Sequence, residues 1–341
     1  MERFALFHCI GKLSIDIMYV KDGVKMGKIA FVFPGQGAQV VGMAKEFYDV
    51  FPESKEIFDI AEQELDFDIK KICFEENEDI NKTEYTQAAI LTAGTSILKA
   101  VELKNVRPDY TAGLSLGEFT ALVANGTLSF ADAVKVVRKR GLYMENEVPA
   151  GEGTMAAIIG VDTEKIEEIC DGVTKETGKP VEPANYNCPG QIVISGETSA
   201  VKLAKERLDE AGARKTVLLK VSGPFHSVML EGVEEKLREE FKSVTFHEGD
   251  TPYVSSVNAK VIAADADRSE IKALLEKQVH VSVKWQQAVE TLLNEGVDTF
   301  VEIGPGKTLS SFIKRISRKV KIININSVSD LDKLDQLSQE C

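Results

Sequence analysis

The sequence of 341 residues is poor in cysteine, in long apolar runs and in positive charge. Its five cysteines are scattered and never spaced as C-x-x-C, which fits a reducing compartment and offers neither a disulfide framework nor a zinc site. The apolar runs fall far short of the ~20 residues that span a bilayer. A formal net charge of -13 argues against a general affinity for nucleic acid or anionic membranes. We therefore expect a cytoplasmic protein without a metal centre.

Residues 1–25 are predicted to be an extension outside the core fold. Their apolar run is broken by His8 and Gly11, and no small-residue cleavage site follows it. These features disfavour a secretory signal peptide, which has an apolar region before such a site. The segment KIAFVF at 28–33, closed by Pro34, is instead typical of a buried strand followed by a turn.

Strand-like and helix-like segments alternate along the chain, which predicts an α/β fold with a mostly parallel sheet. Late strands are indicated by TPYVSSV, DTFVEIG and VKIININ. Residues 151–222 have a different order, β-α-β-β-α-β, which is typical of a ferredoxin-like unit. We therefore predict a large α/β subdomain formed by 26–150 and 223–341, a small ferredoxin-like subdomain at 151–222, and a ligand cleft between them.

The segment AGLSLGEF at 112–119 contains the pattern G-x-S-x-G, with Ser115 at its centre. A strand that delivers this serine and a helix that leaves it would hold the hydroxyl clear of the sheet as a nucleophile. The alternative is a tight strand-to-helix turn that only needs small residues, since glycine lets neighbouring backbone segments pass closely. The pattern alone is compatible with both interpretations.

A nucleophilic serine needs a base, because a free hydroxyl is not ionised at neutral pH. Of the four histidines, His226 in VSGPFHSVML follows a predicted strand and a Gly-Pro turn, where catalytic groups of α/β sheets tend to gather. His8 lies in the extension, His247 in a polar run, and His280 on a partly apolar segment that suits an ordinary core histidine. His226 is therefore the predicted base.

Arg140 lies among apolar neighbours on a predicted helix. The residues three and four positions away are Val136, Val137, Tyr143 and Met144. An arginine on such a face either extends its charged end to solvent or is buried with an anionic partner. The helical pattern by itself leaves both interpretations open.

Seven segments, in the same order along the chain, resemble motifs of the bacterial malonyl-CoA:acyl carrier protein transacylases. They are FPGQGAQVVGM, GLSLGEFTALVANG, RKRGLYMENEVP, ANYNCPGQIVISG, GPFHS, KQVHVSVKW and VEIGPGKTL, within about residues 28–320. The resemblance implies a hydrolase-like α/β domain with an inserted ferredoxin-like subdomain. It also implies transfer of malonyl from malonyl-CoA to the phosphopantetheine thiol of acyl carrier protein, for fatty-acid synthesis and without a cofactor.

The resemblance assigns the catalytic groups position by position. Ser115 would carry the malonyl group as an ester, and His226 would be its base. The main-chain carbonyl of Gln278 would orient His226, in the role that aspartate has in a full triad. The main-chain N–H groups of Gln36 and Leu116 would form the oxyanion hole.

The resemblance also implies the substrate contacts. Arg140 would hold the malonate carboxylate, and the pair Leu116 and Phe225 matches the side chains that accompany malonyl preference in related polyketide acyltransferases. Asn187 is a weaker candidate near the cleft. One position departs from the family, because Leu114 stands where the residue before the nucleophile is usually histidine. We expect this leucine to change substrate contacts and to leave the chemistry intact.

Two rival functions share these features. A serine hydrolase such as a thioesterase would use the same serine and histidine, and a non-catalytic scaffold could keep the fold alone. Acyl carrier proteins are strongly acidic, so docking of one on this acidic chain requires a local basic patch. The candidates are KRISRKVK at 314–321 and the pair at 214–215, either of which could equally be a solvated face.

Overall fold

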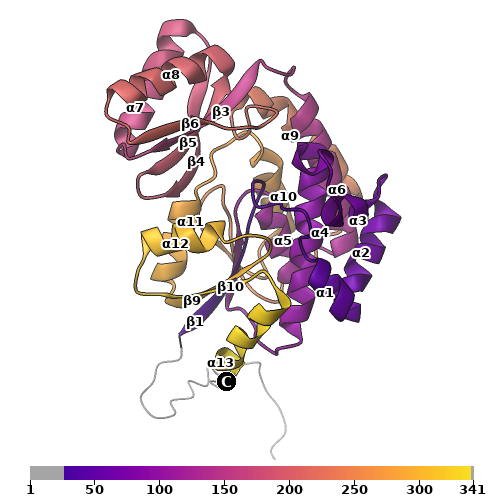
Figure 1. Ribbon diagram of the computed structural model, residues 1–341. Coiled ribbons are helices and arrows are strands. Elements are labelled where there is room, and N and C mark those ends of the chain that lie inside the picture. Colours follow the sequence, from indigo (N-terminus) through magenta and orange to yellow (C-terminus); the bar gives the residue numbers. More distant parts are fainter. Residues whose placement is uncertain (1–26, 339–341) are drawn as a thin grey trace, which may run out of the picture.

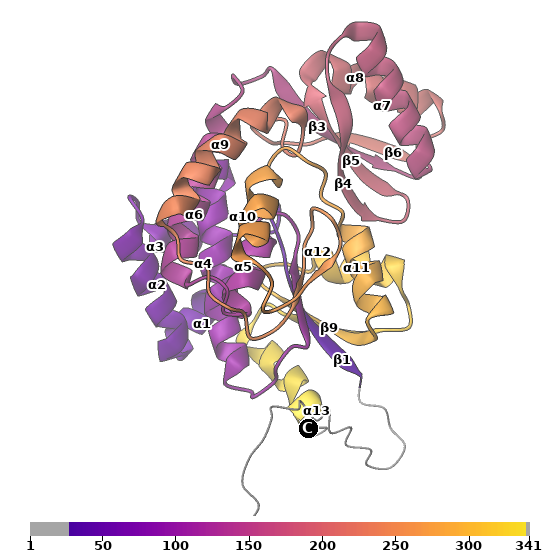
Figure 2. The same ribbon diagram turned by 180° about the vertical axis from the view of Figure 1, so that it is seen from behind.

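The chain folds around two β-sheets (Figures 1 and 2), and the computed structural model describes residues 27–338. The predicted extension at 1–25 lies outside the described residues. Within them, the larger sheet has six strands in the order β10-β9-β1-β2-β7-β8, and all neighbours pair in parallel except β7 with β8. These strands are β1 (Lys28–Phe33), β2 (Tyr110–Gly113), β7 (Tyr253–Val254), β8 (Val261–Ile262), β9 (Val297–Ile303) and β10 (Lys321–Ile325).

Strand β1 shows how the large sheet is buried on both faces. Because successive side chains of a strand point to opposite faces, Phe31 and Phe33 join one core while Ala30 and Val32 join another. The first core is covered by α1 (Lys45–Val50), α2 (Pro52–Glu64), α3 (Ile69–Phe74), α4 (Thr83–Glu102), α5 (Gly117–Ala124), α6 (Phe130–Asn146), α9 (Glu231–Glu240) and α10 (Arg268–Lys277). The second is covered by α11 (Trp285–Asn294) and α12 (Thr308–Ile316), on the other side of the sheet in Figure 1. The predicted α/β fold with a mostly parallel sheet is confirmed.

The smaller sheet is antiparallel, in the order β4-β5-β3-β6, and two helices pack against it. Along the chain its elements are β3 (Gly153–Ile159), α7 (Thr163–Thr177), β4 (Val181–Cys188), β5 (Gln191–Glu197), α8 (Thr198–Glu210) and β6 (Lys215–Leu218). This is the β-α-β-β-α-β order predicted for the ferredoxin-like insert. In Figures 1 and 2 the unit stands beyond one end of the large sheet.

The small sheet is joined to the large subdomain through β4 and the hairpin after it. The amide of Tyr186 donates to the carbonyl of Val283 (2.9 Å), and the amide of Val283 donates to the carbonyl of Ala184 (2.8 Å). Arg315 on α12 donates to the side chain of Gln191 (2.7 Å). Part of the basic segment at 314–321 thus supports the junction, and its proposed docking role stays a prediction.

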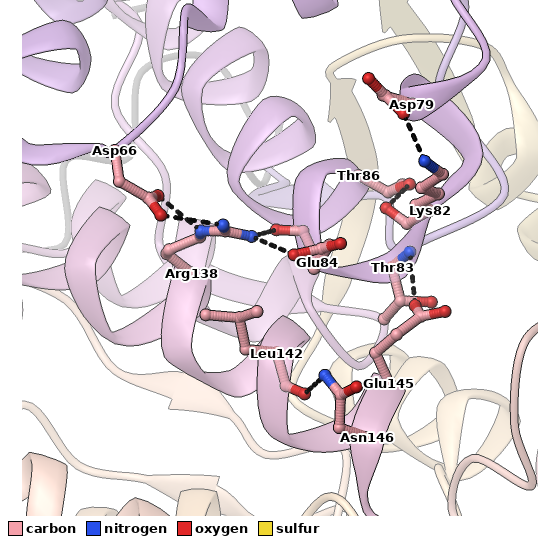
Figure 3. A network of polar contacts seen from close by, with 10 residues as sticks. All are labelled: Asp66, Asp79, Lys82, Thr83, Glu84, Thr86, Arg138, Leu142, Glu145 and Asn146. Carbon is pink, nitrogen blue, oxygen red and sulfur yellow. Dashed lines mark hydrogen bonds and ion pairs between the residues drawn. The ribbon is translucent and has the colours of Figure 1, made fainter. Parts of the chain in front are cut away.

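Helix α6 is fixed against the start of α4 by a buried cation, as Figure 3 shows. Arg138 donates two hydrogen bonds to the carboxylate of Asp66 (2.8 and 3.1 Å) and two to Glu84, one each to its carbonyl and side chain (2.8 and 3.0 Å). Its guanidinium carbon lies 5.0 Å from the ring centroids of Phe67 and Tyr85. Because a bidentate pair fixes orientation as well as distance, this network holds α6 in register with α4.

Candidate active site

A strained turn between β2 and α5 carries Ser115. The residue has φ of +54°, a left-handed conformation that non-glycine residues seldom adopt. A Cβ at Gly113 would lie 1.9 Å from the carbonyl carbon of Gly117, and a Cβ at Gly117 would lie 2.1 Å from the carbonyl oxygen of Phe33. Both glycines are therefore sterically required. The tight turn that the sequence left as an alternative is present, and it also directs the serine into a cleft.

The predicted nucleophile and base lie in contact, although they are 111 positions apart along the chain. Ser115 Oγ is 2.7 Å from His226 Nε2, and His226 Nδ1 is 2.8 Å from the main-chain oxygen of Gln278. An amide–carbonyl bond from His226 to Val279 holds the backbone of the histidine in place (3.0 Å). Since a carbonyl only accepts, Nδ1 carries the proton and Nε2 is free to accept one from the serine.

Burial keeps the imidazole neutral. His226 is 5% exposed, and this burial together with the positive charge of Arg140 lowers the pKa of His226 to about 3. The bond to the carbonyl of Gln278 opposes that shift and only partly offsets it. At neutral pH the ring is therefore an unprotonated acceptor beside Ser115, which is the state a general base requires.

Arg140 is buried beside the serine, so the alternative of an arginine extended to solvent is wrong. The side chain is 1% exposed, and its Nη2 donates to Ser115 Oγ (3.2 Å) and to Gln278 Oε1 (3.0 Å). Its Nη1 donates to Gln87 Oε1 (2.6 Å). Among residues 27–338 none of these partners of Arg140 is a carboxylate, and its Nε–H has no hydrogen-bond partner.

The charge on Arg140 survives this burial. Desolvation lowers the pKa of Arg140 to about 9, which still leaves the guanidinium protonated at neutral pH. A buried cation without a directly paired anion is costly, because its attraction to an anion normally offsets the loss of water. The arrangement therefore suits the binding of an anionic group next to Ser115.

The cleft around these residues is lined from both subdomains. Met155, Asn187 and Val193 contribute from the small sheet, and Phe225 and Phe312 contribute from the large subdomain. The cleft predicted between the two units is therefore present, with Ser115, His226 and Arg140 on its wall. Its lining is mostly apolar apart from these groups, as is usual for a ligand site.

The two predicted oxyanion-hole residues lie on the same wall. Gln36 and Leu116 both line the cleft, and within residues 27–338 neither main-chain N–H has a hydrogen-bond acceptor. The side chain of Gln36 donates to the hydroxyl of Thr83 (3.0 Å), which holds that side chain in place. Leu114 also lines the cleft, and its side chain packs with the second core, so an apolar surface stands there.

Within residues 27–338, neither of the other two histidines is hydrogen-bonded to Ser115. His247 is exposed, and His8 lies outside the described residues. His280 was expected to be an ordinary core histidine, but the structure corrects this interpretation. It is only partly buried, and its Nε2 lies 2.6 Å from the carboxylate of Glu234 on α9. The charged face of α9 supplies a polar partner that the apolar neighbours of His280 did not indicate.

Three features of the site were missed from the sequence. Gln87 and the side chain of Gln278 hold Arg140, and Glu118 lies behind them. The only available signal was a polar residue inside an apolar helical run, as in TQAAIL for Gln87. Within the described part of the chain, no helix has the length and hydropathy of a membrane span, and no cluster of three or more potential metal ligands occurs.

Comparisons with known proteins place the chain and its fold in one family. The family model of the acyl transferase domain matches residues 30–334. The malonyl CoA-acyl carrier protein transacylase of Bacillus subtilis (strain 168) is 44% identical over 92% of this chain and 98% of its own length. The crystal structure of the corresponding transacylase from Clostridium perfringens is 41% identical, with a TM-score of 0.86 over 92% of this chain and 98% of its own.

A second solved structure contains a partner. It is a complex of a type II PKS acyl-carrier protein with its malonyl-transacylase, 34% identical to this chain, with a TM-score of 0.87 over 91% of this chain and 99% of its own. The similarity of all three relatives extends over nearly the whole of each chain. This chain therefore belongs to the acyl transferase family and, within it, to the malonyl CoA-acyl carrier protein transacylases.

Proposed function

We propose that the protein transfers a malonyl group from malonyl-CoA to the phosphopantetheine thiol of acyl carrier protein, through a malonyl-serine intermediate, for fatty-acid synthesis in the cytoplasm. The observation that carries the proposal is the buried cluster at Ser115. Its Oγ lies 2.7 Å from the neutral base His226 and 3.2 Å from the cation Arg140. The names of the relatives state the same donor and acceptor.

In the first half-reaction Ser115 Oγ attacks the thioester carbonyl while His226 Nε2 accepts the hydroxyl proton. The carbonyl of Gln278 stabilises the imidazolium that forms, because it accepts from Nδ1 at 2.8 Å. The amides of Gln36 and Leu116 receive the oxyanion, and each such donor lowers the barrier by about 3 kcal/mol. His226 returns the proton to the departing CoA sulfur.

In the second half-reaction the carrier-protein thiol attacks the malonyl-serine. His226 accepts the thiol proton and later gives it to Ser115 Oγ, so the enzyme returns to its starting state. No cofactor enters either step, because the serine, the base and two amides complete the acyl transfer. Donor and acceptor use one site in turn, which requires ping-pong kinetics.

Arg140 binds the carboxylate of the donor. A guanidinium offers two parallel N–H donors to a carboxylate, and Nε of Arg140 is a buried donor without a partner among the described residues. A fatty acyl chain would leave that charge unpaired, so the site favours a carboxylated donor over the substrates of lipases. Phe225 and Leu116 supply the apolar wall beside it, and Asn187 contributes a polar group from β4.

Labelled malonyl-CoA distinguishes this function from its rivals. We expect label on the protein in the absence of carrier protein, and label on the carrier protein when it is added. Release of free malonate without transfer would identify a hydrolase. The absence of both products would identify a non-catalytic scaffold.

The pH dependence tests the state of the base. Because the pKa of His226 is lowered, the ring stays neutral when the pH falls below 6.5, and the rate of serine acylation is retained there. We expect the decrease of kcat/KM on the acid side of the pH profile, here called the acid arm, to occur nearer pH 3 than pH 6.5. The measurement uses acetyl-CoA as well as malonyl-CoA, because acetyl has no carboxylate that titrates. An acid arm near pH 6.5 with both donors would show that His226 is solvated.

A further inference from the structure

Gln278 connects the predicted base, nucleophile and cation through its side chain and its main-chain oxygen. Its Oε1 accepts from Arg140 Nη2 (3.0 Å), and its Nε2 donates to the main-chain oxygen of Ser115 (3.2 Å). The main-chain oxygen of the same residue accepts from His226 Nδ1 (2.8 Å). The hydrogen-bond network also extends away from the cleft, because Gln278 Nε2 donates to Glu118 Oε2 at 2.8 Å.

Glu118 is a fully buried carboxylate on α5, three residues after Ser115. Its Oε2 accepts from the amide of Ser256 (3.0 Å), from the hydroxyl of Ser256 (2.6 Å) and from Gln278 Nε2. Burial raises the pKa of Glu118, and the three donors that converge on one oxygen oppose this shift by favouring the ionised form. An ionised carboxylate in such a place needs a cation nearby.

The buried cation on the other side of the amide is Arg140. If the Gln278 amide were reversed, its NH₂ group would face the donors of the guanidinium, and its oxygen would face the carboxylate of Glu118. Both contacts would be repulsive, because donors would meet donors and acceptors would meet acceptors. The charges at the two ends therefore set the direction of the amide, and the amide links the two charges.

We propose that Glu118 is a positioning residue, the buried counter-charge that acts through the Gln278 amide to keep Arg140 charged and directed at Ser115, and that it thereby sets the preference for a carboxylated acyl donor. This inference rests on the proposed malonyl transfer. Glu118 does not touch the donor itself. Glu118 offsets the positive charge of Arg140 through one intervening residue, so the guanidinium keeps N–H donors available for the substrate.

Other ionisable groups face this pair and are held neutral. His226, on the segment after β6, has its pKa lowered to about 3. Tyr253, on β7, has its pKa raised well above its ordinary value by burial, by Glu118 and by Glu270 of α10. The donors that converge on Glu118 Oε2 favour its ionised form, so Glu118 and Arg140 are the two opposed groups on either side of the Gln278 amide.

The test is Glu118→Gln, which keeps an oxygen for the donors of Ser256 and Gln278 and removes the charge. We expect kcat/KM for malonyl-CoA to fall about 10- to 100-fold while kcat/KM for acetyl-CoA changes by less than about threefold. Labelling of Ser115 by a fluorophosphonate, which needs the serine and the base but no carboxylate clamp, should stay near the wild-type rate. An unchanged ratio of malonyl to acetyl transfer would overturn the proposal.

The pH at which kcat/KM for malonyl-CoA decreases on the alkaline side, here called the alkaline arm, distinguishes an effect on Arg140 from a merely structural one. A structural role of Glu118 would leave that pH unchanged. Arg140 has a pKa of about 9, and Glu118 raises it against the effect of burial. Removal of that charge lowers the pKa of Arg140 further, so E118Q should lose malonyl transfer at lower pH than the wild type. If E118Q lost malonyl transfer at the same alkaline pH as the wild type, Glu118 would not act on the charge of Arg140.

Glu302→Gln is the matched control. Glu302 is also a fully buried carboxylate, and it accepts from Leu309 and Ser310 at the start of α12. Its replacement should leave unchanged both the ratio of kcat/KM for malonyl-CoA to that for acetyl-CoA (the donor ratio) and the pH of the alkaline arm. It should lower the free energy of unfolding. A shift in the donor ratio as large as that of E118Q would show that any buried glutamate has this effect, and would overturn the proposal.

If E118Q does not fold, Gln278→Met tests the same link. It keeps the main-chain carbonyl that His226 needs and removes the amide between Glu118 and Arg140. We expect the ratio of kcat/KM for malonyl-CoA to that for acetyl-CoA to fall, and a wild-type ratio would overturn the proposal. Failure of the proposed function itself is a separate outcome, because the wild-type protein would then transfer no malonyl group.

Discussion

Replacement of Ser115 by alanine is expected to abolish formation of the labelled acyl-enzyme from malonyl-CoA. The variant keeps His226, the oxyanion amides and Arg140, so donor binding remains while the atom that forms the ester is absent. Loss of a nucleophile of this kind typically costs about 10⁶-fold in kcat. The measurement is mass spectrometry of the intact protein after incubation with malonyl-CoA, with transfer to carrier protein followed in parallel.

Ser195→Ala provides the control for this experiment. Ser195 is another fully buried serine, on β5, and its hydroxyl has no hydrogen-bond partner within residues 27–338. Its replacement should leave acylation unchanged. Label that persists on the S115A protein would show that another residue is the nucleophile, and the mechanism proposed above would then fail.

Replacement of Arg140 by alanine is expected to reduce malonyl transfer by about 100-fold or more and to leave acetyl transfer within about fivefold of the wild type. The lost contacts are charge-assisted hydrogen bonds to the donor carboxylate, each worth about 1.5–3 kcal/mol, and acetyl-CoA makes none of them. The two kcat/KM values measured side by side decide the result. Equal losses for both donors would refute the carboxylate clamp.

Arg138→Ala separates the clamp from a general effect on helix α6. Arg138 lies two residues earlier on the same helix and bonds to Asp66 and Glu84 (Figure 3). None of these three residues lines the cleft. Loss of Arg138 leaves two carboxylates without their cation, so we expect a lower free energy of unfolding and a similar decrease for both donors. A selective loss of malonyl transfer in this variant would show that the position of helix α6, and not the guanidinium of Arg140, controls the preference for malonyl-CoA over acetyl-CoA.

The turn at Ser115 could be recognised from the sequence because its causes are local. Two glycines around a serine, after a short apolar run and before a helical pattern, describe a strand-to-helix turn whatever the rest of the fold. His226 was predictable for a similar reason, since it follows a strand end in an α/β chain. The contact between the two, however, joins residues 111 positions apart, and only the folded large subdomain brings them together.

The surroundings of Arg140 could not be predicted in the same way. Its apolar helical neighbours are compatible with a side chain that reaches solvent and with one that is buried. The acceptors that decide the matter come from α4 and from the residue after α10, which are 53 and 138 positions away. Only the resemblance to a family indicated a role for this arginine, and it named no role for the side chain of Gln278.

The amino-acid sequence by itself determined the α/β class, the insert and the turn at Ser115, and it singled out His226 as the predicted base, because strand and helix periodicity and glycine sterics act over a few neighbouring residues. The tertiary structure alone decided that Arg140 is buried, that Gln278 joins it to His226, and that Glu118 lies behind both. These facts depend on which distant elements exclude water from a side chain. Desolvation and charge pairing are properties of the assembled core, and no local pattern encodes them.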